Sequence, residues 1–124
     1  MNPPPNARPI DSAAIVLLCD GPTGPEVFML RRHDKMATHA GAYVFPGGKV
    51  EAADAGFHGG GRLDQPSAAL RQALDEPGLD EAAATSLYVA AIRETFEECG
   101  VLLAHRPGEE DRAPTIAPHT GAFA

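Results

Sequence analysis

Residues 93–101 read Arg93-Glu94-Thr95-Phe96-Glu97-Glu98-Cys99-Gly100-Val101, and this stretch decides how the rest of the chain is interpreted. On a helix, residues three and four positions apart share a face, so Glu94, Glu97 and Glu98 lie within an arc of roughly 100°. Three carboxylates this close repel one another unless a positive charge lies among them. A hard divalent cation, which prefers carboxylate oxygens, is the natural candidate.

The same stretch is the end of one long predicted helix over residues 80–99. Asp80 follows the Pro77-Gly78 break as a plausible N-cap, and Gly100 lies where a glycine commonly ends a helix. An apolar stripe with helical spacing predicts the face that packs on the core. Its members are Val89, Ile92, Phe96 and Cys99.

Composition predicts one modest domain that does not bind nucleic acid through a broad basic surface. The chain has 124 residues, 44% of them hydrophobic, and a net charge of −7. An acidic protein can still bind a phosphorylated substrate when a metal ion bridges the two negative partners. The partner predicted on this ground is a small molecule.

The apolar pattern and the N-terminus indicate where the chain resides. No stretch approaches ~18 consecutive apolar residues, so no membrane span is expected. Residues 1–5 lack the charge and apolar run of a signal peptide, which makes a cytoplasmic location the default. Cys19 and Cys99 fall in apolar patterns and are predicted to be buried free thiols rather than a disulfide.

Three short strands are expected before the helix, at residues 13–18, 26–31 and 43–45, with a polar loop over 32–42. The first is a short apolar, β-branched run and is predicted to be buried. The third strand runs into Pro46-Gly47-Gly48-Lys49. The predicted organisation is a flexible tail (1–9), a domain (10–104) that contains an insertion at about 55–79 with a short helix at 67–74, and an irregular tail (105–124).

Phe45-Pro46-Gly47-Gly48-Lys49 together with Arg93-Glu94-x-x-Glu97-Glu98-x-Gly100 resembles the signature of the Nudix hydrolases. Thr95 occupies a position that is usually aliphatic. Gly48 precedes Arg93 by 45 positions, where the family signature has 14, so roughly 31 residues divide the motif. Counted forward from Gly48, the first acid of the signature falls on Asp54, and counted back from Arg93 it falls on Thr85.

The divided motif resembles the coenzyme A diphosphatase-like branch of the family, in which a long insertion lies inside the Nudix box. Arg32, Gly41 and the Phe-Pro-Gly-Gly run fit part of a coenzyme A-associated signature, although its second arginine falls on Ala37. The resemblance implies an α/β/α sandwich of the α+β type. The family normally has further strands and a helix after the signature, so only the N-terminal part is expected here.

The resemblance also implies a chemistry. Nudix enzymes use Mg²⁺ or Mn²⁺ to hydrolyse a diphosphate linked to another group, usually a nucleoside, with water activated by the metal. Carried over by motif, the metal ligands are Glu94, Glu97, Glu98 and the backbone of Gly48. Arg93 joins the catalytic set by orienting a carboxylate, and Arg32, Gly47 and Gly48 are the implied substrate-binding residues. Coenzyme A or an acyl-coenzyme A is the favoured substrate, with NADH and ADP-ribose behind it.

Other motifs carry less weight. Gly47-Gly48-Lys49 lacks the leading glycine and the Ser/Thr of a P-loop, and His58-Gly59-Gly60-Gly61 lacks the partner motif of an esterase. The five histidines have no zinc-site spacing and are interpreted as surface residues. The competing hypothesis is a catalytically inactive Nudix-like binding module or fragment, whose exposed core face would favour self-association into homo-oligomers.

Overall fold

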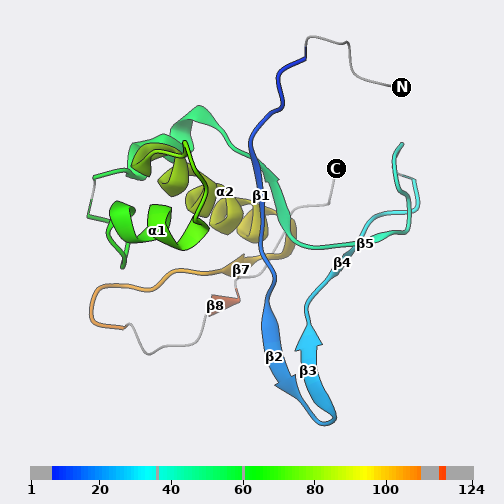
Figure 1. Ribbon diagram of the computed structural model, residues 1–124. Helices are drawn as coiled ribbons and strands as arrows, with labels where there is room; N and C mark the ends of the chain where they lie inside the picture. The colour runs from blue at the N-terminus through cyan, green and yellow to red at the C-terminus, as the bar shows by residue number, and fades with distance from the viewer. Residues whose placement is uncertain (1–6, 36, 60, 110–114, 117–124) are drawn as a thin grey trace.

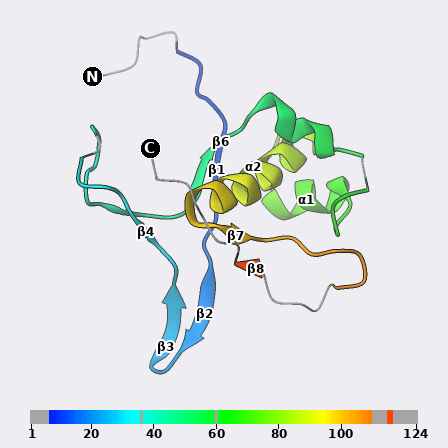
Figure 2. The same ribbon diagram turned by 180° about the vertical axis from the view of Figure 1, so that it is seen from behind.

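The computed structural model describes residues 7–35, 37–59, 61–109 and 115–116. Helices and short antiparallel strands occur together, so the predicted α+β class is confirmed. In Figures 1 and 2 the long helix α2 (Glu81–Cys99) lies between α1 (Ser67–Leu74) on one side and the strands β1 (Ser12–Ala14) and β6 (Gly47–Lys49) on the other. Helix α2 is therefore the element around which the described residues are arranged.

Helix α2 begins and ends where the sequence predicts. The Asp80 carboxylate accepts a hydrogen bond from the Ala83 N–H at 2.7 Å, which satisfies one of the free donors of the first turn. At the other end Gly100 has φ 73°, and its N–H donates to the Phe96 carbonyl at 2.8 Å. A side chain at position 100 would strain this left-handed conformation, which explains the glycine.

The strands form four antiparallel pairs within the described ranges. The β1–β6 pair aligns Ala13 with Gly48 and Ala14 with Gly47, so the glycine pair lies inside a strand that contacts α2 rather than in a loop. The other pairs are β2 (Leu18–Gly21) with β3 (Gly24–Val27), β4 (Leu30–Arg31) with β5 (Tyr43–Val44), and β7 (Val101–Leu102) with β8 (Thr115–Ile116).

The predicted strand over 13–18 is divided, and its predicted burial is wrong. The chain leaves the β1–β6 pair after Ile15 and begins the β2–β3 hairpin at Leu18, which extends away from the helices in Figure 1. Leu18 is 66% exposed and Cys19 is exposed, because no other described element covers this hairpin. Cys99 is half-buried, and both thiols are free.

The buried core is small and lies along α2. Ala84 and Ala90 are fully buried and Val89 is 7% exposed, together with Leu70 of α1. The predicted stripe is only partly correct, since Phe96 is 40% exposed while Thr95 is fully buried. Small side chains let β6 and α1 approach α2 closely, so compact residues rather than the large apolar ones fill this interface.

The 55–79 segment contains the predicted helix, and a turn that the sequence did not predict overlaps its start. Helix α1 has the predicted bounds, and a 3₁₀-helix, η1 (Ala52–Phe57), precedes it. Both elements pack against α2. A side-chain hydrogen bond of 3.0 Å from Thr85 Oγ1 to Ser67 Oγ joins the start of α1 to α2.

The ends of the chain are described only in part. Residues 7–9 are exposed without regular structure, while residues 1–6 and most of the predicted tail over 105–124 lie outside the described residues. Strand β8 is a short pairing inside that predicted irregular tail. No helix among the described residues combines the length and the apolar character that crossing a bilayer requires.

Candidate functional site

The two halves of the divided motif meet at Arg93. Asp54, on the α2-facing side of η1, is 1% exposed and lies 39 positions before Arg93 in the chain. Arg93 Nε donates to Asp54 Oδ1 at 3.0 Å and Arg93 Nη2 donates to Oδ2 at 3.1 Å, a bidentate arrangement. Of the two positions to which counting assigns the first acid of the signature, Asp54 is therefore the one that contacts the arginine.

Arg93 also contacts the acids of its own helix. Its Nη1 lies 3.1 Å from Glu94 Oε1 and 3.5 Å from Glu97 Oε2, and Glu97 is four positions further along the helix. Nη2 donates to the Lys49 carbonyl of β6 at 3.0 Å. One guanidinium thus links η1, β6 and α2. We call Arg93 and its partners the Arg93 cluster. The partners are Asp54, Glu94, Glu97, Glu51 and the Lys49 carbonyl.

The electrostatics of the pair follow from this geometry. Hydrogen bonds from Arg93 lower the pKa of Asp54 against the opposing effect of burial, and the Glu51 N–H, which donates to Asp54 Oδ2 at 2.8 Å, lowers it further. The same contact with Asp54 raises the pKa of Arg93. Both groups remain charged at neutral pH, so the pair is a fixed ionic link.

Gly47 and Gly48 are required by close packing. A Cβ atom at Gly48 would overlap the Glu94 carboxylate, and one at Gly47 would overlap the backbone of β1 at Ala13 and Ala14. Glycine at both positions lets the strand backbone approach the helix and its neighbouring strand. The structure therefore brings together Gly48 and Glu94, two of the residues for which the motif implies metal binding.

Glu98 has a different environment from Glu94 and Glu97. Burial raises its pKa, and the negative charges of Glu94 and Glu97 add to the effect, while a hydrogen bond from the Gly47 backbone and the positive charge of Arg32 oppose it. A partly buried carboxylate near two others is an unfavourable arrangement for the isolated protein. A bound cation would relieve it.

The remaining predicted residue, Arg32, lies at the base of the 32–42 loop. Its N–H donates to the Ala42 carbonyl at 2.8 Å, and its carbonyl accepts from Gly41 at 3.1 Å. Among the described residues its Nε is buried without a hydrogen-bond partner. The positive charge of Arg32 acts on Glu98 and opposes the rise in its pKa that burial causes, so Arg32 is a cationic group that faces this acid.

The donor chemistry fits a divalent cation, but the carboxylates are not gathered around one point. Over the described ranges, no group of three His, Cys, Asp or Glu side chains is close enough to hold a metal ion. Arg93 Nη1 lies next to two of the three acids for which metal binding was predicted, Glu94 and Glu97. The guanidinium of Arg93 therefore offsets part of the repulsion between these carboxylates, a role predicted from the sequence for a bound cation.

Two members of the Arg93 cluster were not identified from the sequence. Glu51 Oε1 lies 3.7 Å from Arg93 Nη1, and the Lys49 carbonyl accepts from Nη2. A backbone carbonyl leaves no sequence signal. Glu51 does have one, because it stands three residues before Asp54, the spacing of an N-terminal capping pair.

Comparison with known proteins supports the resemblance. The acyl-coenzyme A diphosphatase NUDT19 of Gallus gallus is 35% identical over an alignment of 145 positions, which covers 92% of this chain. The chain spans 38% of the length of that relative. No family model matches the chain, and no solved structure matches it significantly. The similarity supports the Nudix family, which the divided motif indicates.

Proposed function

We propose that this chain is the portion of a Nudix hydrolase that carries the signature helix, and that the whole protein cleaves the diphosphate linkage of coenzyme A or an acyl-coenzyme A. The observation that carries the proposal is the contact of Asp54 with Arg93 beside Gly48. This contact joins residues that lie 39 positions apart in the chain, which supports the proposal that an insertion divides the signature. Residues 10–104 form the domain in this proposal, with 55–79 as its insertion.

In this proposal each residue near the signature helix has a separate role. Arg93 orients Glu94 and Glu97 and is itself held by the buried Asp54. Gly47 and Gly48 allow the backbone of β6 to lie against the acids. The guanidinium of Arg32, whose positive charge acts on Glu98, binds an oxygen of the substrate diphosphate.

Mg²⁺ or Mn²⁺, held by Glu94, Glu97, Glu98 and the Gly48 carbonyl, would neutralise the diphosphate and lower the pKa of a coordinated water. The raised pKa of Glu98 is the feature of the structure that favours such a site. The net charge of −7 gives no support to a nucleic-acid partner, and that expectation stays a prediction. The cytoplasmic location and the self-association also stay predictions.

The substrate preference rests on the relative and on the long segment inside the motif. The name of the Gallus gallus protein specifies acyl-coenzyme A. The divided signature resembles that branch of the family, which supports the same preference. NADH and ADP-ribose are the alternatives, because both contain the same diphosphate linkage.

A catalytically inactive Nudix-like module is the second candidate. It is favoured by the absence of a three-ligand group among the described side chains and by the contacts of Arg93 with the acids. In that case the Arg93 cluster would be a structural ion-pair network.

The experiment compares the protein that carries this chain with its Glu97→Gln/Glu98→Gln variant. Product formation from coenzyme A, NADH and ADP-ribose would be measured with Mg²⁺ and with Mn²⁺, and folding would be checked by circular dichroism. We expect turnover of coenzyme A and a loss of at least ~100-fold in the variant. No turnover by the folded protein would reject the hydrolase, and equal activity of the two proteins would reject the metal-ligand assignment.

A further inference from the structure

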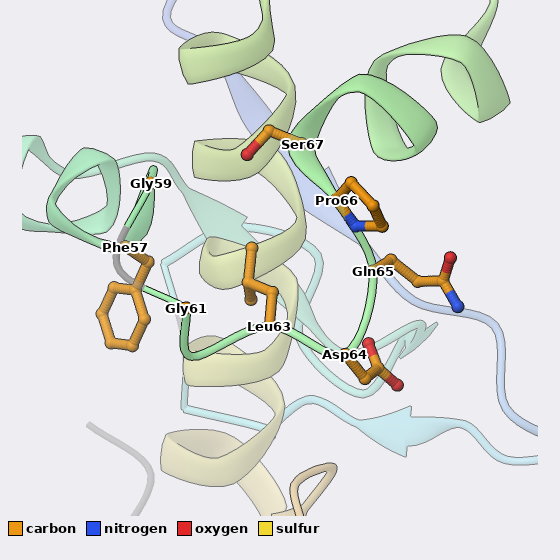
Figure 3. Close-up of a pocket in the computed structure, with 8 residues that line it drawn as sticks. All are labelled: Phe57, Gly59, Gly61, Leu63, Asp64, Gln65, Pro66 and Ser67. Carbon is orange, nitrogen blue, oxygen red and sulfur yellow. The ribbon is translucent and has the colours of Figure 1, made fainter.

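A pocket lies in the 55–79 segment, on the part of the molecule that holds α1 rather than β6. Its volume is about 320 Å³, and the described residues that line it are Phe57, Gly59, Gly61, Leu63, Asp64, Gln65, Pro66 and Ser67. Figure 3 shows the lining residues on the loop that joins η1 to α1, with the Ser67 hydroxyl directed back toward the Phe57–Gly59 stretch. This volume is at the lower end of the range of small-molecule sites.

The lining favours a neutral ligand. Phe57, Leu63 and Pro66 supply apolar walls. The charged groups nearby are of opposite sign: the Arg62 guanidinium lies 5.6 Å from the centroid of the Phe57 ring, and Asp64 lines the pocket. Arg62 is not part of the lining, so the Asp64 carboxylate makes the pocket unfavourable for an anion, while burial of apolar surface favours an uncharged body.

One polar group is fixed toward this space by the fold. Ser67 Oγ accepts a hydrogen bond from Thr85 Oγ1 at 3.0 Å, and the Thr85 side chain is fully buried on α2. The second neighbour of Ser67 Oγ is His58 Nδ1 at 3.1 Å. A hydroxyl accepts two hydrogen bonds and donates one. When His58 is protonated on Nδ1, Ser67 therefore keeps its own proton for an oxygen of a ligand.

The pocket is also joined to the Arg93 cluster. Phe57 and Asp54 are three positions apart on η1, and in a 3₁₀-helix such residues lie one above the other. A ligand that contacts Phe57 and Ser67 spans the two ends of the loop between η1 and α1. It holds η1 against α2, where Asp54 contacts Arg93.

We propose that this pocket binds a small neutral molecule with an apolar ring or short aliphatic body and one carbonyl oxygen. The body packs on Phe57 and Leu63, and the carbonyl accepts from Ser67. Because the ligand binds the folded chain, its occupancy stabilises the fold. The site does not depend on the proposed hydrolysis, so either can fail without the other.

Acetophenone is a suitable probe, since it combines one ring with one carbonyl, and benzoate has the same ring with a negative charge. Titration of the chain, followed by amide chemical shifts, is expected to give saturable shifts at residues 57–67 and at Thr85, with half-saturation near ~1 mM for a ligand of this size. Benzoate is expected to need about tenfold more, a difference of ~1.4 kcal/mol in binding.

The variants test the lining directly. Leu63→Asn and Ser67→Ala should each raise the half-saturation concentration of acetophenone about tenfold, while Leu74→Ala, an exposed leucine of α1 outside the lining, should leave it unchanged. Phe57→Ala provides a further test if Leu63→Asn fails to fold by circular dichroism. Shifts confined to the β2–β3 hairpin, equal binding of benzoate, or affinity insensitive to all foldable lining variants would each overturn the proposal.

Discussion

Asp54→Ala should destabilise the chain far more than an average aspartate substitution. The change removes two charge-assisted hydrogen bonds to Arg93, at 3.0 and 3.1 Å, and the 2.8 Å bond from the Glu51 N–H. Each such bond contributes about 1.5–3 kcal/mol when a charged group is involved. Arg93 keeps its contacts with Glu94 and Lys49, so we expect a net loss of about 3 kcal/mol rather than the full sum.

Urea unfolding at pH 7 measures this loss directly, and thermal unfolding should show a decrease of roughly 12 °C in Tm for a chain of this length. Asp20→Ala, on the exposed β2–β3 hairpin, is the matched control and should change stability by less than about 0.5 kcal/mol. Asp54→Asn should resemble Asp54→Ala, because its amide would place a donor against the donors of Arg93 or Glu51.

The effect should also depend on pH in a defined direction. Arg93 lowers the pKa of Asp54, so the stability from this pair is complete above the unfolded pKa near ~3.9 and is lost as pH falls through the lower folded pKa. The difference between wild type and Asp54→Ala should therefore shrink in acid below about pH 4. A variant as stable as wild type at pH 7 would refute the role assigned to the pair.

Three other substitutions test the site and the helix. Gly48→Ala should cost about 1–3 kcal/mol in urea unfolding, because its Cβ would overlap the Glu94 carboxylate, whereas Gly56→Ala, with open space at the Cβ position, should be nearly neutral. Glu98→Gln should stabilise the chain at pH 7 but not at pH 4. The raised pKa of Glu98 means that folding disfavours its ionised form, and thermal unfolding at both pH values, without and with Mg²⁺, checks this. Gly100→Ala should lower the free energy of unfolding by about 1 kcal/mol, because φ is 73° there. Urea unfolding followed by circular dichroism checks this, and a variant as stable as wild type would contradict it.

The sequence predicted best what local rules control. The ends of α2 depend on Asp80 and Gly100, so helix chemistry alone placed them, and the predicted short helix over 67–74 is present as α1. Of the candidate site, the i, i+4 contact of Arg93 with Glu97 was predictable for the same reason. These features involve residues within one element.

Contacts and burial that depend on residues distant in the chain were predicted poorly. Counting placed the first acid of the signature on Asp54, an acidic match, or on Thr85, which is no match, and left the role of Asp54 open. The packing of η1 on α2 supplies that role, since Asp54 is ion-paired with Arg93 while Thr85 is bonded to Ser67. The burial of Leu18 and Cys19 was predicted from their apolar neighbours. It fails because burial depends on a covering element, and none of the described elements covers the β2–β3 hairpin.

The link between Asp54 and Arg93 has a consequence for how this chain can change over evolutionary time. Because the acid and the arginine are joined in space, the length of chain between them is under weak thermodynamic control: doubling a flexible loop costs only about 0.6 kcal/mol. The two ends, at η1 and at the Ser67–Thr85 bond, are the parts that tolerate little change. Insertions and deletions should therefore accumulate between these two ends, at positions that leave η1 and the Ser67–Thr85 bond in place.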